Sequence, residues 1–251
     1  MNKTLSELSG AKQKELMSKK ILIIIPAYNE QGNIQKVIEE IYAADSSLSV
    51  LVVNDGSTDN TFGEASKTKA MVVSLPFNLG IGGAVQTGFK FANKNDYDIA
   101  VQVDGDGQHD IKYLEKLIAL ILNNEADISI GSRFIPPYLG YQSSFIRRIG
   151  INFFARLISF LTDYKVTDPT SGFRAYNKKM IEVFAGYYPN DFPEPEAIMV
   201  AGRYRARVKE VPVQMRKRMT GSSSIRYLKT LQYMIKVTLA ILLEKIKRKK
   251  V

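Results

Sequence analysis

The feature that most constrains the fold of this chain is a run of five large aliphatic residues, Ile21 to Ile25, which stops at Pro26. The run has no polar residue at alternate positions, so a strand formed by it must be covered on both faces, as in a parallel sheet. The strands expected from such apolar runs cover 21–25, 49–53, 72–73, 99–103 and 128–130. The helices expected from apolar residues at helical spacing cover 31–44, 80–92 and 111–122. Strands that alternate with helices predict an α/β fold with an open sheet.

Polar segments marked by Gly or Pro follow three of these strands, at the point where each strand ends. They cover 26–30, 54–59 and 104–110. Because the carboxyl ends of parallel strands meet at one edge of a sheet, the three segments are expected to converge on one rim. Open α/β sheets bind their ligands at that edge, so the sequence predicts a binding site there.

The last of these segments carries two carboxylates and an amide at alternate positions, Asp104, Asp106 and Gln108, with glycines between them. Alternate residues of an extended segment point the same way, and glycine lets a ligand come close to the backbone. Oxygen ligands of this kind suit Mg²⁺ or Mn²⁺ that bridges to phosphate oxygens. A solvated Asp/Gly turn is the competing interpretation of the same five residues.

Two other segments carry weaker signals. Residues 55–59 form either a ligand contact or a turn that caps a helix through Ser57 or Thr58. Residues 78–84 place three glycines at the start of an expected helix, where a phosphate can meet backbone N–H groups.

In their order along the chain, these motifs resemble the signature of the family 2 glycosyltransferases, which are inverting, metal-dependent enzymes of the GT-A fold. Three later motifs are similar to those of the polyprenyl-phosphate hexosyltransferase branch, the dolichyl-phosphate mannose synthase group and its bacterial relatives. The resemblance covers about residues 21 to 224. Asn54 departs from it, because the family usually has a second aspartate there. The matching segments are PAYNE at 26–30, VNDGS at 53–57, NLG at 78–80, DGDGQH at 104–109, GSRF at 131–134, SGFR at 171–174 and RMTGSS at 218–223.

The resemblance implies a mixed, mostly parallel sheet flanked by helices, and a role for individual residues. A nucleotide diphosphate sugar is expected on Pro26, Tyr28, Glu30, Val53, Asp55 and Asp104. A divalent metal, Mg²⁺ or Mn²⁺, is expected on Asp106 and Gln108. The expected catalytic residues are Asp106 and Glu196, the latter where inverting enzymes of this fold commonly keep an acid/base. Donor or acceptor phosphates are expected on Arg133, Arg147, Ser171 and Arg218, although Arg147 equally suits a solvated helix face.

The implied reaction moves a hexose from a nucleotide diphosphate sugar to polyprenyl phosphate. Transfer to a hydroxyl of a lipid-linked saccharide in polysaccharide assembly stays open, as does a catalytically silent GT-A domain that docks on a membrane. A nucleotidyltransferase is disfavoured, because no Gly-rich loop with Lys or Arg follows the first strand. The absence of Cys excludes a thiol nucleophile, and the single His, His109, argues against a His-rich zinc centre. His109 is expected beside the site, because one imidazole has no partner for a proton relay.

Positive charge is concentrated at the carboxyl end of the chain. Residues 203–251 contain fifteen Lys or Arg and two acids, whereas the first 202 residues carry twenty basic and twenty-three acidic side chains. Such a tail favours a polyanionic partner, either nucleic acid or an anionic membrane face. No base-reading module accompanies the charge, so nucleic acid is not expected as a partner.

The tail also carries one apolar stripe at helical spacing, formed by Ile225, Leu228, Leu231, Ile235, Leu239, Leu242 and Ile246. Its longest uncharged run, Val237 to Leu243, is far short of the roughly 20 residues that span a bilayer. The stripe predicts a basic amphipathic helix in the membrane interface, and residues 145–161 have a similar character. Packing of both helices on the domain is the competing interpretation.

Three parts of the chain are therefore expected: a polar tail over 1–20, a GT-A domain over 21–224 and a basic amphipathic helix over 225–251. Residues 1–20 have no apolar core, so no signal peptide is expected. The expected location is peripheral, on the anionic cytoplasmic face of the membrane, without a transmembrane span. A small membrane protein or a second copy of the chain stays open as a further partner.

Overall fold

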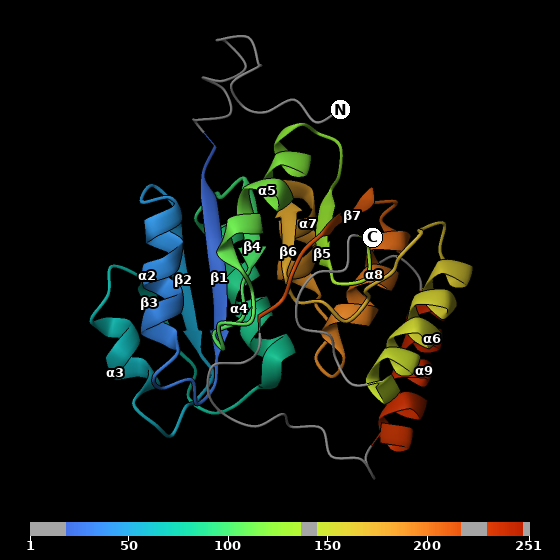
Figure 1. Ribbon diagram of the computed structural model, residues 1–251, viewed down its shortest axis with the longest axis horizontal. Helices are drawn as coiled ribbons and strands as arrows, with labels where there is room; N and C mark the ends of the chain where they lie inside the picture. Colours follow the sequence, from blue (N-terminus) through green and yellow to red (C-terminus); the bar gives the residue numbers. More distant parts are fainter. Residues whose placement is uncertain (1–18, 137–144, 217–229, 248–251) are drawn as a thin grey trace.

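The computed structural model describes residues 19–136, 145–216 and 230–247. Within these ranges one seven-stranded sheet has the order β3-β2-β1-β4-β6-β5-β7 (Figure 1). Its strands are β1 (Ile21–Ala27), β2 (Ser49–Asn54), β3 (Met71–Ser74), β4 (Ile99–Gln102), β5 (Ile128–Ser132), β6 (Arg174–Asn177) and β7 (Val208–Pro212). Only β6 runs antiparallel to its neighbours, β4 and β5, so the sheet is mixed but mostly parallel, as expected.

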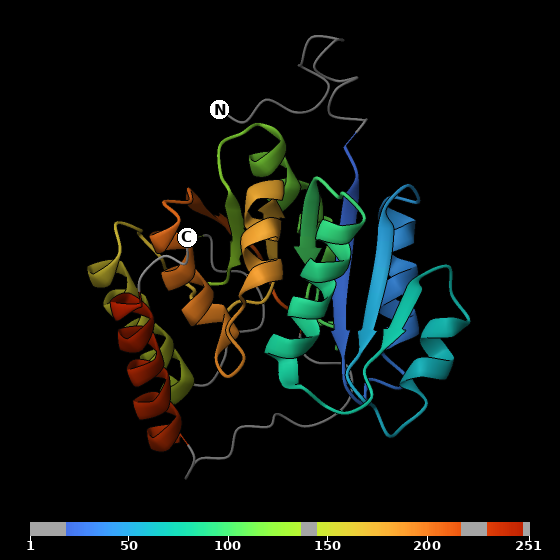
Figure 2. The same ribbon diagram turned by 180° about the vertical axis from the view of Figure 1, so that it is seen from behind.

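Helices cover both faces of this sheet. Helices α2 and α5 pack on one face, and α4 and α7 pack on the other (Figures 1 and 2). The helices are α2 (Ile34–Ala44), α3 (Thr61–Ser66), α4 (Gly80–Lys94), α5 (Leu114–Leu122) with the short η2 (Ile111–Tyr113) before it, α6 (Phe145–Leu161), α7 (Lys178–Gly186), α8 (Pro193–Arg203) and α9 (Thr230–Ile246).

The first strand lies at the centre of this arrangement. Its side chains alternate between two cores, with Ile23 and Ile25 beneath α2 and α5, and Leu22 and Ile24 beneath α4. All four are fully buried. The continuous apolar run is therefore explained by helices on both faces, which confirms the prediction made from it.

Helices α6, α8 and α9 pack together beyond the strands β5 and β7 (Figure 1). Helix α9 buries Val237 and Ile241 in the core shared with α4 and α7, and the ring of Tyr233 lies 6.4 Å from that of Phe154 on α6. Helix α9 is therefore docked on the domain through one of its faces.

A buried carboxylate reinforces this docking. Glu244 on α9 is fully buried and accepts hydrogen bonds from the Tyr187 hydroxyl at 2.5 Å and from Arg203 Nη2 at 2.6 Å. The Lys247 ammonium also donates to it. The end of α9 is thus joined to α8 and to the residue that follows α7 by charge-assisted hydrogen bonds.

The predicted apolar stripe of this helix lies on the opposite side. Its described members Ile235, Leu239, Leu242 and Ile246 are all exposed. The helix therefore packs on the domain, as the competing interpretation expected. The apolar stripe from which a membrane-interface helix was predicted faces away from the domain. None of the helices in the described ranges is both long and apolar enough to cross a bilayer. Residues 1–18 of the expected tail, and 225–229 and 248–251 of the expected helix, lie outside the described residues.

Candidate active site

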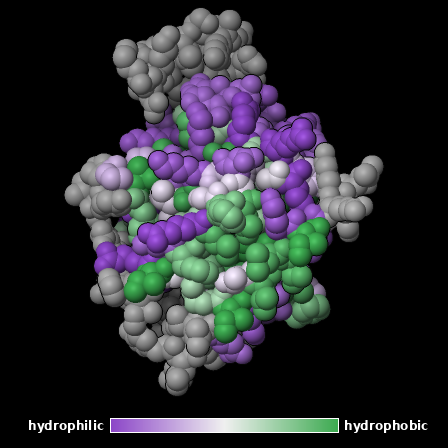
Figure 3. All heavy atoms as spheres, turned by 90° about the vertical axis from the view of Figure 1, so that its right-hand side faces the viewer, coloured by the Kyte–Doolittle hydropathy of each residue, from purple (hydrophilic) through white to green (hydrophobic). Residues whose placement is uncertain are grey.

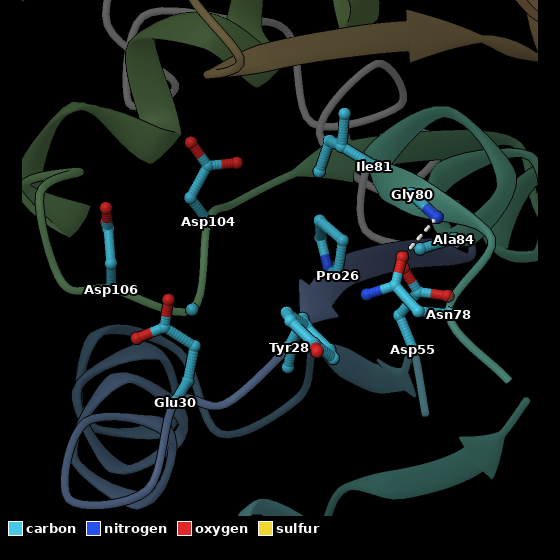
Figure 4. Close-up of a pocket in the computed structure, with 12 residues that line it drawn as sticks. Pro26, Tyr28, Glu30, Asp55, Asn78, Gly80, Ile81, Ala84, Asp104 and Asp106 are labelled. Atoms are coloured by element: carbon cyan, nitrogen blue, oxygen red, sulfur yellow. Dashed lines mark hydrogen bonds between the residues drawn. The ribbon is translucent and has the colours of Figure 1, made fainter. Parts of the chain in front are cut away.

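The three polar segments that follow β1, β2 and β4 converge at the carboxyl ends of these strands, as the sequence predicted. With the start of α4 they enclose an open cavity of about 380 Å³ (Figure 4). Five of the six residues expected to hold the nucleotide sugar line it; the sixth, Val53, is buried in the sheet. The cavity is lined by Pro26, Ala27, Tyr28, Glu30, Asp55, Asn78, Gly80, Ile81, Ala84, Asp104, Gly105 and Asp106.

Loops that follow β2 and β3 form one end of the cavity, where Asp55 and Asn78 lie together (Figure 4). The Asp55 carboxylate is almost fully buried and accepts a hydrogen bond from the backbone N–H of Leu79 at 2.7 Å. Gly56 allows this close approach, because its φ is +66° and a Cβ there would lie 2.7 Å from the backbone nitrogen of Asn78. The two loops therefore hold Asp55 in a fixed position at this end.

Asn54, the departure from the family pattern, does not line the cavity. Its side-chain Nδ2 donates to the Ser74 hydroxyl at 3.1 Å, and its Oδ1 accepts from the backbone N–H of Ser57 at 3.3 Å. The residue joins β2 to β3 and shapes the turn after β2. The departure therefore lies outside the cavity wall, one residue before Asp55.

Acidic side chains gather at the other end of the cavity, where Figure 4 shows Glu30, Asp104 and Asp106. Asp106 Oδ1 accepts a hydrogen bond from the backbone N–H of Gln108 at 3.0 Å. The Gln108 side chain donates through Nε2 to the carbonyl of Arg216, so its Oε1 is the atom suited to a cation. Hence the metal residues expected from the sequence lie in one short loop at the cavity.

In the described part of the chain, no three Asp, Glu or His side chains are arranged to hold a metal by themselves. Mg²⁺ usually takes one or two carboxylates from the protein and completes its octahedron with water and substrate phosphates. Asp106 and Gln108 fit that kind of site, in which a diphosphate supplies further ligands.

His109 fixes the backbone of this loop from behind. Its Nδ1 accepts a hydrogen bond from the backbone N–H of Asp104 at 3.0 Å, and its Nε2 lies 3.4 Å from Asp104 Oδ2. The ring is buried and stacks on Phe173, with centroids 4.8 Å apart. Because Nδ1 accepts, the proton of a neutral ring is on Nε2 and faces the carboxylate. His109 therefore positions Asp104, and it lies beside the cavity as expected.

The loop between α6 and β6 reaches the acidic end of the cavity. An added Cβ on Gly172 would lie 2.9 Å from Gln102 Nε2 and 3.1 and 3.2 Å from the Asp104 carboxylate oxygens, so any larger residue would require these side chains to shift. Ser171 is buried, and its hydroxyl accepts from the backbone N–H of Phe173 at 3.3 Å. The loop therefore stands beside Asp104, with Ser171 inside it.

Arg133 directly follows β5 and pairs with this loop, and it is not among the residues that line the cavity. It donates from Nε and Nη2 to the two carboxylate oxygens of Asp168, at 2.7 and 2.8 Å. Burial alone would lower the pKa of Arg133, but the hydrogen bonds to Asp168 and the charge of Asp104 outweigh burial and raise it. Arg133 is thus a fixed cation in the field of Asp104.

Neither of the other two arginines expected to bind phosphate is placed at the cavity by a described side chain. Arg147 is exposed in the first turns of α6, and Arg218 lies outside the described residues. Arg174, which ends the SGFR motif, is buried and donates to the backbone carbonyls of Pro169, Ser171 and Glu194. It therefore ties the loop before β6 to the first turn of α8.

Glu196 lies in that first turn of α8 and is almost fully buried. Its carboxylate accepts a hydrogen bond from the backbone N–H of Phe192 at 3.1 Å. Burial raises the pKa of Glu196 to about 7, and the charges of Glu244 on α9, Lys247 directly after α9 and Asp191 before α8 also act on it. The charges around Glu196 therefore come from the end of α9 and from the loop before α8.

Glu194, two residues earlier, has a different environment. Burial raises the pKa of Glu194, Arg174 opposes this rise, and the charge of Asp104 adds to it. Glu194 is therefore the carboxylate of this turn that interacts with the acidic end of the cavity. The sequence analysis overlooked it; the only available signal was a second acid in the Pro-Glu-Pro-Glu segment.

Comparison with known proteins agrees with this geometry. Residues 22–184 match the model of glycosyl transferase family 2, and the chain belongs to that family. It is a glycosyltransferase with the GT-A fold. Glucosyl-3-phosphoglycerate synthase from Mycobacterium tuberculosis, solved with Mn²⁺, UDP and glucosyl-3-phosphoglycerate, superposes with a TM-score of 0.71 at 19% identity, over 100% of this chain and 86% of that one.

Relatives in sequence support the polyprenyl-phosphate branch. The UDP-N-acetylglucosamine–dolichyl-phosphate N-acetylglucosaminyltransferase of Methanococcus voltae is 32% identical over 79% of this chain and 86% of its own length. The undecaprenyl-phosphate mannosyltransferase of Micrococcus luteus is 29% identical over 82% of this chain and 87% of its own. The dolichol-phosphate mannosyltransferase of Pyrococcus furiosus is 32% identical, over 82% of this chain and 59% of its own.

Proposed function

We propose that this glycosyltransferase transfers a hexose from a nucleotide diphosphate sugar to polyprenyl phosphate, with inversion at C1 of the sugar. The observation that carries the proposal is the cavity itself, which has fixed Asp55 at one end and the Asp104–Gln108 loop at the other. Such a cavity suits a nucleoside at the Asp55 end and a diphosphate at the acidic end. The names of the relatives supply the lipid phosphate as acceptor.

Asp106 and Gln108 are the residues that would hold Mg²⁺ or Mn²⁺ together with the donor diphosphate. When bound, the cation neutralises the charge that develops on the departing nucleoside diphosphate. Fixed groups of the protein do the remaining work, since Asp55 and Tyr28 orient the nucleoside, and the loop with Gly172 closes the wall beside Asp104. An acceptor oxygen then attacks C1 while the bond from C1 to the diphosphate oxygen breaks, and the diphosphate leaves with the electron pair.

The acceptor decides whether a base is needed. A phosphate monoester has a second pKa near 6 and is mostly a dianion at neutral pH, so it attacks without losing a proton. A sugar hydroxyl is very weakly acidic, and a positioned base contributes about 10²–10⁴-fold to its attack. With polyprenyl phosphate as acceptor, Glu196→Gln is therefore expected to lower kcat at pH 7.5 by less than about a hundredfold.

The test is a panel of nucleotide sugars assayed with polyprenyl phosphate and Mg²⁺ or Mn²⁺, followed by extraction and analysis of the lipid. A new glycosyl phosphate lipid supports the proposal. A protein that is inert on polyprenyl phosphate but glycosylates a lipid-linked saccharide in a Glu196-dependent way overturns it. Absence of transfer and of donor hydrolysis with every nucleotide sugar would instead indicate a silent domain.

The same proposal places the enzyme on the cytoplasmic face of the membrane through one surface, which we call the α6–α9 face. Figure 3 shows apolar side chains gathered on this side of the molecule. Its exposed apolar residues are Ile149, Phe153, Phe160, Ile235, Leu239, Leu242, Leu243 and Ile246. Exposed cations on the same two helices are Arg147, Arg156, Lys236, Lys245 and Lys247. Apolar side chains bordered by cations suit an anionic lipid surface.

Substitutions on the outer side of α9 test this location better than truncation, because truncation would also remove the buried Val237 and Ile241. The double variant Leu239→Ser, Leu242→Ser should lose most of its sedimentation with phosphatidylglycerol-containing vesicles, and high salt should weaken binding of the unaltered protein. Phe62→Ser is the matched control, because Phe62 is half exposed on α3, on the far side of the sheet (Figure 1). Equal sedimentation of all three proteins would refute the α6–α9 face as the docking surface.

A further inference from the structure

Most of the hydrogen-bond donors of the Arg133 side chain are already occupied within the protein. Asp168, which is fully buried, accepts from three groups of Arg133: Nε at 2.7 Å, Nη2 at 2.8 Å and the backbone N–H at 3.2 Å. The Thr170 hydroxyl accepts a further hydrogen bond from Nη2 at 2.8 Å. These contacts occupy Nε–H and both hydrogens of Nη2. Of the five guanidinium hydrogens, the two on Nη1 have no hydrogen-bond partner among the residues that the structure describes, and they are those left for a ligand.

Asp168 is itself fixed from the opposite side. Glu210 on β7 accepts from the backbone N–H of Asp168 at 2.8 Å and from the backbone N–H of Thr167 at 2.9 Å. It also accepts from the Thr167 hydroxyl at 2.7 Å, and that hydroxyl lies 2.6 Å from the hydroxyl of Ser132. The carboxylate that holds Arg133 is thus part of a hydrogen-bonded framework that joins β5, β7 and the loop before β6.

We propose that Asp168 is a positioning residue that presents Nη1 of Arg133 to the phosphate of the acceptor. The inference rests on the proposed function, because it takes a phosphate as the group that Arg133 meets. The Arg133 guanidinium is only 16% exposed and its other donors are occupied, so it is held in one orientation and loses little side-chain freedom when it binds a phosphate. Asp168 also pairs with the Arg133 cation when no ligand is bound, because an unpaired charge shielded from water would destabilise the protein.

A different role for the same carboxylate makes the opposite prediction. If Asp168 only neutralised Arg133, it would compete with the phosphate, and its removal would strengthen acceptor binding. If Asp168 orients Arg133, its removal weakens acceptor binding. The direction of the change in KM for the acceptor therefore separates the two roles.

The experiment compares Asp168→Asn with Asp127→Asn in steady-state assays on polyprenyl phosphate. Asp127 is a matched control because it also pairs with an arginine, Arg207, which donates to it from Nε at 3.3 Å and from Nη2 at 2.9 Å. This pair lies at the start of β5, whereas Arg133 follows the end of the same strand. Asp168→Asn should raise the acceptor KM at least about tenfold and leave the donor KM within about twofold. Asp127→Asn should change neither constant, although it also lowers the melting temperature.

Arg133→Gln supplies the test of coupling. If Asp168 acts through Arg133, the double variant Arg133→Gln, Asp168→Asn should be no worse than Arg133→Gln alone, within about threefold. Should Asp168→Asn fail to fold, Thr170→Val removes one contact of Nη2 and should raise the acceptor KM by a smaller factor.

The possible outcomes are distinct. Additive effects of the two substitutions, an unchanged acceptor KM, or a lowered one would each overturn the positioning role of Asp168 while leaving the transferase activity in place. If the unaltered enzyme is inert on polyprenyl phosphate, the proposed function fails instead.

Discussion

Removal of the buried carboxylate of α9 should loosen the whole helix. Glu244→Ala leaves Arg203, whose side chain is 14% exposed, without its carboxylate partner, and the Arg203 Nε is already a buried donor with no hydrogen bond in the described structure. Removal of one partner from a buried ion pair costs about 3–5 kcal/mol. Lys247 is half exposed and can be rehydrated, so the lower end of that range, about 3 kcal/mol, is expected.

That cost is comparable with the apolar contribution to docking. Val237 and Ile241 are fully buried, and each contributes about 1.5–3 kcal/mol. The helix should therefore remain attached but open far more often, with little change in the sheet. Urea unfolding should give the loss of about 3 kcal/mol, and amide hydrogen exchange should accelerate most in α9 and its contacts.

The exposed Lys236→Ala on the same helix is the control and should change the free energy of unfolding by less than about 0.5 kcal/mol. A loss below about 1 kcal/mol for Glu244→Ala would show that the ion pair contributes no more than an exposed one. The reasoning about its burial would then fail.

Three further predictions concern the cavity and its surroundings. Asp106→Asn should lower activity at least about a hundredfold without unfolding the protein, and excess chelator should abolish wild-type activity; full activity in chelator would contradict the metal assignment. Glu196→Gln should have the same free energy of unfolding as the wild type near pH 4.5 and a higher one above pH 7, by up to about 3 kcal/mol. The reason is that the raised pKa of Glu196 makes the wild type lose stability as the pH rises from about 4.5 to about 7. Gly56→Ala should lower the melting temperature more than Gly32→Ala, because both residues have positive φ but only at Gly56 would a Cβ meet the backbone of another segment. Equal losses would show that the strain of the positive φ acts alone.

The parallel half of the fold could be predicted from the sequence because its strands are apolar runs. The runs in β1, β2 and β4 are buried on both faces, and the polar segment after each must lie at the rim, so the cavity followed from the pattern. The other half gave no such pattern. Strand β6 reads Arg-Ala-Tyr-Asn, and its first residue is buried because three backbone carbonyls accept hydrogen bonds from the guanidinium, two of them from the preceding loop and one from α8.

Helix α8 and the orientation of α9 could not be predicted from the sequence for related reasons. The two prolines of Pro193-Glu-Pro195 suggest a turn, yet proline is compatible with the first turn of a helix, where its missing N–H is not needed. In α9, Glu244 points inward because Arg203 and Tyr187 lie there, and these partners are 41 and 57 residues away in the chain. Similarly, the pairing of Arg133 with Asp168 depends on a contact across 35 residues.

The order of strands has a consequence during synthesis. Strand β5 is buried along its whole length, but its outer neighbour β7 is made about 80 residues later. At the usual pace of translation this interval lasts roughly 4–16 s, during which the nascent chain carries a strand with an unpaired edge that the folded protein buries. A polypeptide that ends before Val208 keeps that edge permanently. Such a truncated chain should therefore aggregate and should not persist as a smaller transferase. Cells that make this protein need translation to continue through β7.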